Sequence, residues 1–450
     1  MVKDSRKNAQ GDFVKAKRLL LFVSFIGASA VSAFGQIDCT NSSKLVCQLP
    51  VTSSIINASG LLNGSSQVSG YALPINAAFA TQLTQLPVPS ATVGAVNIRQ
   101  KGNEFGTPYQ NLGPILTDRP DTVGRGHLFG GFSYQHFNFT KIDGIDLTTV
   151  PFAYTATITN STTNDTQTFF GSVNNDVSFK LDQYVALLTY GITRQTDVSV
   201  VVPINSVTLD VTAFDFKTYL YDSATNQYIN ESLPTSVTAK TTGSATGLGD
   251  ITINFKEMIH GIDGSPSAVS VGGIARFPSG DALNYLGSGA FGFNAYGLFS
   301  YRAAFSPHLK LSYQWNGRSV LVNPQTTSYG TKALPGGLQY ALGADYKVIP
   351  RLTIAVDLLG NQFVNTPSLS PYSLALTPKP PSGGAIPTSL SGVTESFNTY
   401  TTANLSTGLK VSVWKGLIAY GNVLFQLNNS GIRSDPVPLV GISYHGKVAK

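Results

Sequence analysis

The sequence has few charged residues. Only 12% of its 450 residues are Asp, Glu, Lys or Arg, against 42% that are hydrophobic, and an average soluble domain carries about twice that share of charge. Met and Trp occur twice each, whereas Gly (44), Phe (25) and Tyr (20) are abundant. Because helix formers such as Glu, Lys and Met are scarce, the composition argues against a helical, charged soluble enzyme and favours an all-β fold.

The chain also lacks a basic surface beyond its N-terminus. Of its 30 Lys and Arg residues, six lie in residues 1–35, together with two of the 24 Asp and Glu residues, so the formal charge of +6 is concentrated there. The remaining chain carries 24 basic and 22 acidic residues and no Lys/Arg cluster. Nucleic-acid binding therefore has no electrostatic footprint, and we expect no nucleic-acid partner.

Residues 1–35 have the pattern of a secretory signal peptide. A basic stretch precedes the apolar segment LLLFVSFIGASAVSAFG, which ends in small residues that suit cleavage near Gly35. The alternative is a retained membrane anchor, because the apolar stretch is nearly long enough to span a bilayer. The run of small residues favours cleavage, so we expect an exported protein.

Cysteine is nearly absent. Cys39 and Cys47 are the two cysteines, and in an oxidising compartment they can form one small-loop disulfide. Metal binding is the weaker alternative, because neither His nor another Cys lies near them in the sequence. We expect no metal site and no cofactor, and the pair does not hold the fold in either case.

Patterns that mark catalysis are missing as well. The chain has five His residues, and none has a Ser and an acidic residue at a spacing that suits a catalytic triad. His260 and His308 fall in predicted turns. Neither a P-loop nor a GxGxxG motif occurs before a helix. We predict that the protein is not an enzyme and has no catalytic residues.

Alternating apolar and polar residues recur from His127 onward. In one example, Ile251, Ile253 and Phe255 alternate with polar residues. Twelve strands are predicted, at residues 127–140, 177–192, 196–211, 249–260, 267–278, 290–303, 307–321, 337–348, 351–363, 401–414, 416–429 and 436–446. Short links such as TRQTD and WKG alternate with long polar loops, which are expected at 141–175, 212–246, 279–289, 322–335 and 365–400.

Two features favour a membrane barrel over a soluble β-sandwich, which would show the same alternation. Many predicted strands have at least 11 residues, about the length of a tilted strand that crosses a bilayer, whereas globular strands average about 5–6. Aromatic residues also gather toward strand ends, as interfacial girdles require, at Tyr134, Phe137, Phe139, Phe277, Tyr301, Tyr313 and Trp315. We predict an all-β fold, an antiparallel transmembrane β-barrel of about 12 strands (10–14) over residues 127–450, with lipid bilayer against its apolar face.

Residues 36–126 differ from the rest of the chain. They are rich in Ser, Gly and Pro, with one helix-compatible stretch near 75–83. We predict a mostly irregular N-terminal extension, which is either a periplasmic lead-in or a plug inside the lumen. The sequence does not decide between the two.

Four segments in order resemble a known family. They are ILTDRPDTVGRGHLFGGFSYQHFNF (115–139), LLTYGITRQTDVSVVVPI (187–204), TGLGDITINFKEMI (246–259) and ARFPSGDALNYLGSGAFGFNAYGLFSY (275–301). Together they resemble the outer-membrane transporter family of the meta-pathway of phenol degradation, over about residues 115–446. The resemblance implies a monomeric or loosely associated barrel that admits small, often aromatic or hydrophobic solutes. It implies no particular substrate-binding residue.

The inward parity of the strands predicts which side chains line the lumen. The candidates are Lys256, Arg276, Tyr296, Arg302, Lys310, Asp345, Asp357, Lys410, Tyr184, Tyr190 and Tyr420. Such a mixed lining suits an amphiphilic or aromatic solute, although some of the charges can simply pair with one another. The DRPD segment (118–121) is interpreted as a latch at the barrel entrance, as a cation site, or as a plain charged turn.

These observations predict a channel in the bacterial outer membrane, within a Gram-negative cell envelope, that passively takes up small hydrophobic or aromatic solutes. The alternative is a structural or surface-binding barrel, whose long outer loops at 212–246 and 365–400 contact partners. A third alternative, a secreted soluble sandwich, predicts recovery without detergent. The oligomeric state is left open by the sequence.

Overall fold

The structure is a computed structural model. It describes residues 43–48, 72–90, 111–159, 166–222, 227–230, 238–262, 265–322, 332–377, 384, 387–414 and 416–447. The predicted signal peptide and Cys39 lie outside the described residues. The chain divides into two compact units, Met1–Ile37 and Asp38–Lys450, and all elements below belong to the second. Within the described ranges, no helix is both long and apolar enough to cross a membrane.

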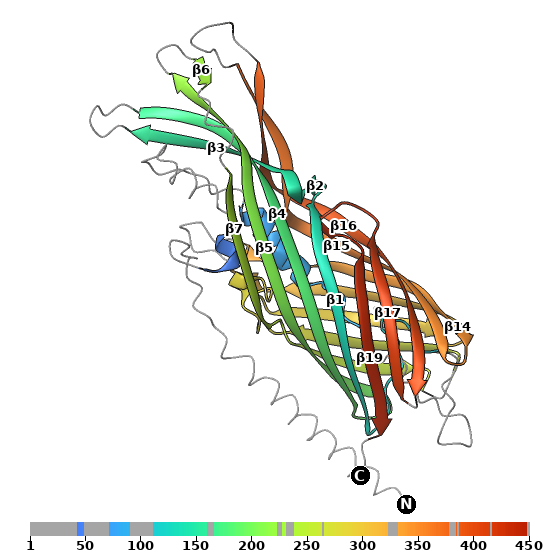
Figure 1. Cartoon of the computed structure of the whole chain (residues 1–450). Coiled ribbons are helices and arrows are strands. Elements are labelled where there is room, and N and C mark those ends of the chain that lie inside the picture. Colours follow the sequence, from blue (N-terminus) through green and yellow to red (C-terminus); the bar gives the residue numbers. More distant parts are fainter. Residues whose placement is uncertain are drawn as a thin grey trace, which may run out of the picture. The chain divides into compact units, whose positions relative to one another are not determined.

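Antiparallel strands form a closed barrel of twelve wall positions (Figure 1). In wall order they are β1 (His127–Ile142), β4 (Thr166–Gly191), β5 (Thr196–Asp222), β7 (Ala239–Leu248) with β8 (Thr252–His260), β9 (Ser267–Arg276), β10 (Gly292–Tyr301), β11 (Phe305–Asn316), β14 (Gly337–Ile349), β15 (Leu352–Leu376), β16 (Thr388–Trp414), β17 (Leu417–Gln426) and β19 (Val437–Lys447). Strands β7 and β8 pair one after the other with β5 and share one position. Strand β19 pairs with β1 and closes the ring. The predicted fold class and the count of twelve are confirmed.

Shorter elements lie between the wall strands and before them. The short strands are β2 (Ile145–Asp146), β3 (Val150–Thr159), β6 (Gln227–Asn230), β12 (Arg318–Ser319), β13 (Lys332–Ala333) and β18 (Ile432–Ser434). The helices are η1 (Leu45–Cys47), α3 (Ala72–Leu83), η2 (Leu147–Thr149) and η3 (Ala282–Asn284). Short turns join β4 to β5, β14 to β15 and β16 to β17 at the end where β1 begins. Short turns mark the periplasmic end of an outer-membrane barrel.

The outer face of the wall is apolar and exposed. On β11, Leu311 is 50% exposed and Trp315 is 50% exposed, and on β19 Ile442 is 55% exposed. The residues that alternate with them face inward, such as Ser312, which is 4% exposed. In a closed barrel whose backbone groups are paired, such a face fits the hydrocarbon of a bilayer.

We expect Leu311→Arg to destabilise the barrel, because it places a guanidinium on the outer face near the middle of β11. An Arg at the bilayer midplane costs about 2–4 kcal/mol. Urea unfolding of the barrel in lipid vesicles measures the loss. Ser373→Arg is the matched control, since Ser373 is exposed on the far part of β15 and should change stability by less than about 0.5 kcal/mol. Equal losses for both variants would contradict a lipid-facing Leu311.

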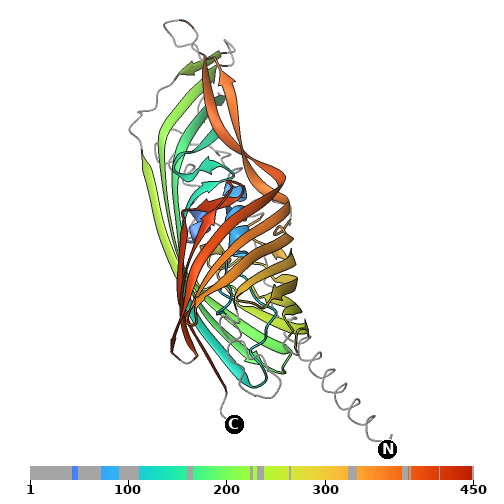
Figure 2. The ribbon, with the colours of Figure 1, turned by 90° about the vertical axis from the view of Figure 1, so that its right-hand side faces the viewer.

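Four wall strands are much longer than the sequence predicts. Strands β4, β5, β15 and β16 have 26, 27, 25 and 27 residues, and they extend past the other strands at the end away from the short turns (Figure 2). The expected loops at 141–175, 212–246 and 365–400 are therefore largely paired strands. Where the two long hairpins meet, Tyr219, Leu376 and Leu390 are buried together with Phe170 beside them.

Tyrosines cover glycines on neighbouring strands at four places in the sheet. In each pair the two residues are directly opposite, so that the ring lies over the bare backbone, a known device for rescuing glycine in a sheet. The pairs are Tyr296–Gly272, Tyr340–Gly360, Tyr372–Gly392 and Tyr420–Gly441. A Cβ atom at any of these glycines would collide with the ring.

Gly441→Val should therefore displace Tyr420 and destabilise the closure of the barrel. Overpacking of this kind costs about 1–3 kcal/mol. The measurement is the temperature at which the compact barrel is lost in detergent, read by gel mobility. Gly297→Val on β10 is the control, because a Cβ atom there meets nothing within 4 Å. A variant at Gly441 as stable as the control would rule out the proposed ring-over-glycine packing.

Candidate functional site

Nine of the eleven predicted lumen residues lie on the inner face of the wall. Lys410 illustrates the geometry, since it is 0% exposed while its neighbours Leu409 and Val411 are 50% and 42% exposed. Lys310 is half-buried and the others are buried, and the nine are Lys256, Arg276, Tyr296, Arg302, Lys310, Asp345, Asp357, Lys410 and Tyr420. Their contact with a solute remains a prediction.

Tyr184 and Tyr190 are exceptions, and their assignment to the lumen is wrong. They are 40% and 46% exposed on the outer face of β4, whereas Val185 and Leu187 between them are buried on the inner face. The error arises because both faces of β4 are apolar here, so that alternation does not distinguish them. The buried polar Gln183 marks the true inward parity.

The segment 111–126 lies against the inner wall, and its DRPD sequence contacts several wall charges. Lys256 on β8 donates from Nζ to the carbonyl oxygens of Arg119 (3.0 Å) and Asp121 (2.8 Å). The same Nζ lies 3.4 Å from a carboxylate oxygen of Asp118. One inward lysine thus contacts three of the four residues of the motif.

A second contact joins Asp121 to the short turns at the periplasmic end. Arg302 donates to Asp121 Oδ1 from Nε (2.9 Å) and from Nη2 (2.5 Å). Its Nη1 donates to the carbonyl oxygens of Gly261 and Ser265, each at 2.8 Å. The guanidinium therefore holds the N-terminal segment and the β8–β9 turn together.

A third contact involves a buried cluster of charges on β11, β14 and β15. Arg119 forms an ion pair with Asp345. His308 lies between two carboxylates, with Nδ1 3.2 Å from Asp345 Oδ1 and Nε2 2.6 Å from Asp357 Oδ1. All three wall residues are at most 1% exposed. The prediction that His308 falls in a turn is wrong, because His308 lies within β11 and faces inward. His308 is two residues before Lys310, so the parity of the strand indicates the inward direction.

Lys410 completes these contacts from the opposite end of the segment. Its Nζ donates to the carbonyl oxygens of Leu112 (3.2 Å) and Pro114. The Leu112 amide in turn donates to Thr353 Oγ1 at 2.9 Å. Asp118, Arg119 and Asp121 of the DRPD motif are thus each paired with a charged residue of the wall, as the latch interpretation requires, and the closing of the barrel entrance stays a prediction.

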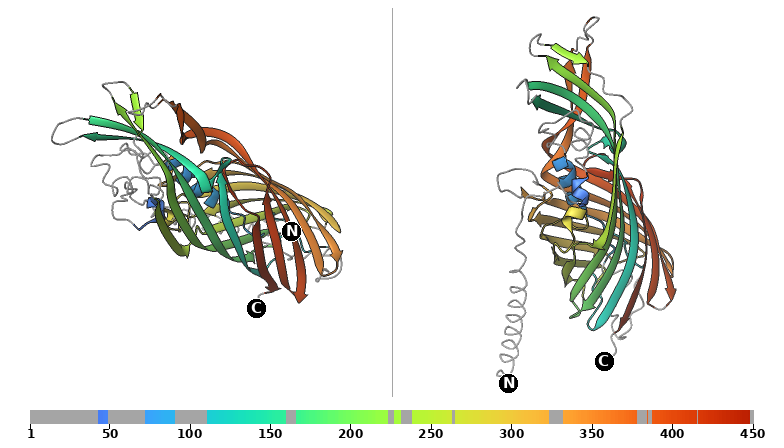
Figure 3. Two further views of the ribbon diagram at one scale, coloured as in Figure 1. Left: turned by 45° about the horizontal axis from the view of Figure 1, so that its top comes forward. Right: turned by 60° about the vertical axis from the view of Figure 1, so that its left-hand side comes forward.

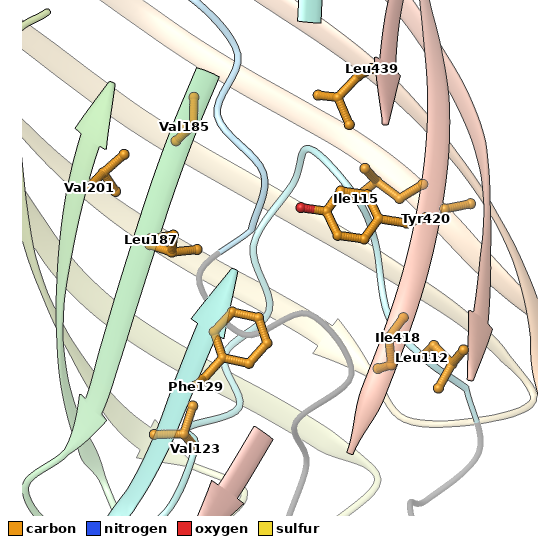
Figure 4. Packing of buried hydrophobic residues seen from close by; sticks show 11 residues of the cluster. Leu112, Ile115, Val123, Phe129, Val185, Leu187, Val201, Ile418, Tyr420 and Leu439 are labelled. Carbon is orange, nitrogen blue, oxygen red and sulfur yellow. The ribbon is translucent and has the colours of Figure 1, made fainter. Parts of the chain in front are cut away.

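Apolar packing accompanies the latch on the wall formed by β1, β4, β17 and β19. Figure 4 shows Ile115 beside Tyr420, with Leu112 near Ile418 and Val123 near Phe129. These side chains are at most 8% exposed. The N-terminal segment therefore contributes to a hydrophobic core inside the barrel.

Helix α3 also lies within the ring of strands (Figure 3). Its Phe79 stacks on Phe179 of β4 at a centroid distance of 4.0 Å and meets Tyr285 edge-on at 5.4 Å. Tyr285 Oη donates to Asn76 Oδ1 on the same helix. Phe139 packs in this group at 6.4 Å from Phe79.

The membership of Phe139 in this inner group corrects one aromatic prediction. Phe137 and Phe139 were expected in an interfacial girdle, but they are 2% and 4% exposed on the inner face. Where both faces of a strand end carry aromatic residues, the sequence alone does not show which of these residues face lipid.

Of the two cysteines that are predicted to form a disulfide, the structure describes Cys47. Cys47 is disulfide-bonded, and Cys39 lies outside the described residues, so the pairing stays a prediction. Next to Cys47, Lys44 forms a 2.6 Å ion pair with Asp281, and the Leu45 amide donates to Asn284 Oδ1 at 3.1 Å. The short helix η1 thus contacts the loop between β9 and β10.

A cavity of about 280 Å³ remains between the N-terminal segment and the wall. Residues 84–90 and 116–118 line one side, and residues of the wall strands, among them Phe137 of β1, line the rest. Its volume is near the lower end of the range for small-molecule sites. Within the described residues, no group of His, Cys, Asp and Glu is arranged to hold a metal ion.

Comparisons with known proteins give fold-level similarity only. No protein-family model matches the chain and no curated protein matches its sequence, so membership of the phenol-degradation family remains a prediction. Among solved structures, the chain is similar to a COG4313 outer membrane channel from Pseudomonas putida F1, with 12% identity, a TM-score of 0.41, and coverage of 73% of this chain and 98% of that one.

Two further structures are similar at lower scores. A Pseudomonas aeruginosa FadL homologue has 11% identity and a TM-score of 0.29, covering 71% of this chain and 89% of that one. The outer membrane channel DcaP of Acinetobacter baumannii has 9% identity and a TM-score of 0.27, covering 71% and 96%. Similarity this low carries no argument about function, which rests on the geometry of the lumen.

Proposed function

We propose that the protein is an outer-membrane channel for the passive uptake of small hydrophobic or aromatic solutes. The observation that carries the proposal is the cavity inside a closed barrel whose outer face is apolar. A barrel that only anchored surface segments would have no need of a lumen with both apolar and polar walls. Twelve strands also lie between small side-chain-filled barrels and wide porins, so a narrow passage is expected.

In this proposal, the extension over residues 36–126 is the plug of the channel, and residues 127–450 form the barrel. Support comes from the three wall contacts of the DRPD motif and from the buried Phe79 of helix α3. Passage then requires either a narrow path beside the segment or its partial release. The ion pairs are discrete contacts that can break one at a time.

Solute flux through the purified barrel tests the proposal. A barrel that migrates faster before heating than after it confirms that the tested protein is folded. Planar-bilayer recordings should then show small, discrete conductance steps, and liposomes should take up small aromatic compounds faster than liposomes without protein. A folded barrel without conductance and without uptake would overturn the channel.

The alternative function, a barrel that presents a binding surface, has one observation in its favour. The long hairpins β4–β5 and β15–β16 extend past the rest of the wall and expose apolar side chains, among them Tyr372 and Leu374 at 41% and 40%. The same flux experiment separates the two functions, since only the channel requires the lumen to pass solute.

A further inference from the structure

The cavity has two chemically different walls. Phe137, Leu187 and Val201 contribute an apolar surface from β1, β4 and β5. Strands β11 and β14 lie six wall positions from β1 and β4 respectively, and they contribute a polar surface that includes Lys310 and Gln339. In a twelve-position ring, strands six positions apart are opposite one another. A solute in the cavity therefore meets apolar side chains on one side and polar side chains on the other.

The lining of the cavity as a whole carries more positive than negative charge. Its charged lining residues are the cations Arg276, Lys310 and Arg433 and the single carboxylate Asp118. Asp118 is already occupied, since one oxygen accepts from Ser90 Oγ at 2.8 Å and the other lies 3.4 Å from Lys256 Nζ. Both oxygens of the Asp118 carboxylate therefore already have partners within the protein.

In the part of the chain that the structure describes, two of the three cations form no ion pair with a carboxylate. Arg276 lies 3.6 Å from Asp250, whereas no carboxylate in the described part of the chain is within 4.0 Å of Lys310 or Arg433. Arg433 donates to the neutral side chains of Asn404 and Asn428. A charge inside a barrel is costly unless it is paired, so an anion would complete both sites.

Lys310 is the better placed of the two to bind a solute. Its Nζ lies 5.2 Å from the centroid of the Tyr296 ring, a contact weaker than an ion pair. Next to it runs a chain of amides in which Asn294 donates to Gln339 at 2.7 Å and Gln339 donates to Gln314 at 2.8 Å. Such amides can bind a second oxygen of an anionic group while the ammonium binds the first.

Resting on the proposed channel function, we propose that the cavity selects small organic anions that combine one carboxylate with an apolar body, with Lys310 as the group that binds the carboxylate. The apolar body would lie against Leu187 and Val201 on the opposite wall. A neutral aromatic solute would satisfy that wall but would leave the ammonium unpaired. An inorganic anion would pair with the ammonium but would leave the apolar wall in contact with water.

The test compares benzoate with benzamide, which has nearly the same size and shape but no charge. Uptake of each into liposomes is measured for the full protein, for Lys310→Met, for Lys310→Arg and for the control Lys217→Met, whose lysine is exposed at one of the long hairpins. We expect Lys310→Met to lower benzoate uptake about tenfold, since hydrogen bonds to charged groups are the strong ones. Benzamide uptake should not change, and Lys310→Arg and Lys217→Met should retain benzoate uptake.

Binding of benzoate to the purified barrel, measured by equilibrium dialysis, separates the failure of this inference from the failure of the channel. Binding that depends on Lys310, without uptake of either compound, would overturn the channel and leave the anion site. Equal uptake of benzoate and benzamide, unaffected by Lys310→Met, would overturn the anion site and leave the channel. Uptake of benzoate that falls only with Lys310→Met supports both.

Discussion

Changing Asp121 to leucine is expected to release the N-terminal segment from the periplasmic end of the barrel and to raise the conductance. Arg302 contacts Asp121 Oδ1 from two nitrogens, and both side chains are at most 5% exposed. Removing one partner of a buried ion pair costs about 3–5 kcal/mol. Because about 1.4 kcal/mol corresponds to a factor of ten, the ratio of released to docked segment should rise about 100-fold or more.

Single-channel recordings in planar bilayers measure this release as more frequent or longer open events. Asp182→Leu is the matched control, because Asp182 pairs with His136 at 2.8 Å on the outer side of the wall, with both side chains more than a third exposed. It should leave the conductance at the wild-type level. A folded Asp121→Leu barrel that conducts no better than this control would show that the motif does not limit passage.

The number and order of the wall strands could be predicted because lipid imposes a strict alternation. Leu409 and Val411 face outward and Lys410 faces inward, and no soluble partner layer blurs that contrast. Strand segments that extend beyond the bilayer have no lipid against their outer face, so they need not alternate apolar and polar residues. On the far part of β15 and β16, the hydroxyl oxygens of Ser370 and Ser396 lie 2.7 Å apart, and the paired strands there have the composition of a loop.

The inward charges could be predicted from parity, but their partners could not. His308 follows Pro307, which signals a turn in the sequence, although both residues lie within β11. The contacts of the N-terminal segment join residues that are far apart in the chain, since Lys410 binds the carbonyl oxygen of Leu112 298 positions away. Composition, period and local motifs contain no information about such pairs, which is why the extension had two open interpretations.

His308→Leu is expected to lower the free energy of unfolding by about 3–5 kcal/mol, because it leaves two carboxylates in the wall without the imidazole between them. Asp345 and Asp357 are both 0% exposed, and Asp357 Oδ1 loses its 2.6 Å contact with Nε2. Urea unfolding in lipid vesicles measures the change. His260→Leu is the control, since His260 is exposed and its Nε2 lies 3.1 Å from the hydroxyl of Ser267, and it should cost less than about 0.5 kcal/mol.

A double variant distinguishes an unpaired buried charge from a simple loss of packing. Adding Asp357→Leu to His308→Leu removes the carboxylate that loses its ion-pair partner, since Asp345 is still paired with Arg119, and replaces it with an apolar side chain. If the cost of the single variant comes from unpaired charge, the double variant should be more stable than His308→Leu, because replacing a whole buried pair by apolar groups is often neutral. If instead the two losses add, His308 and Asp357 would contribute through the shape of their side chains rather than through their charges.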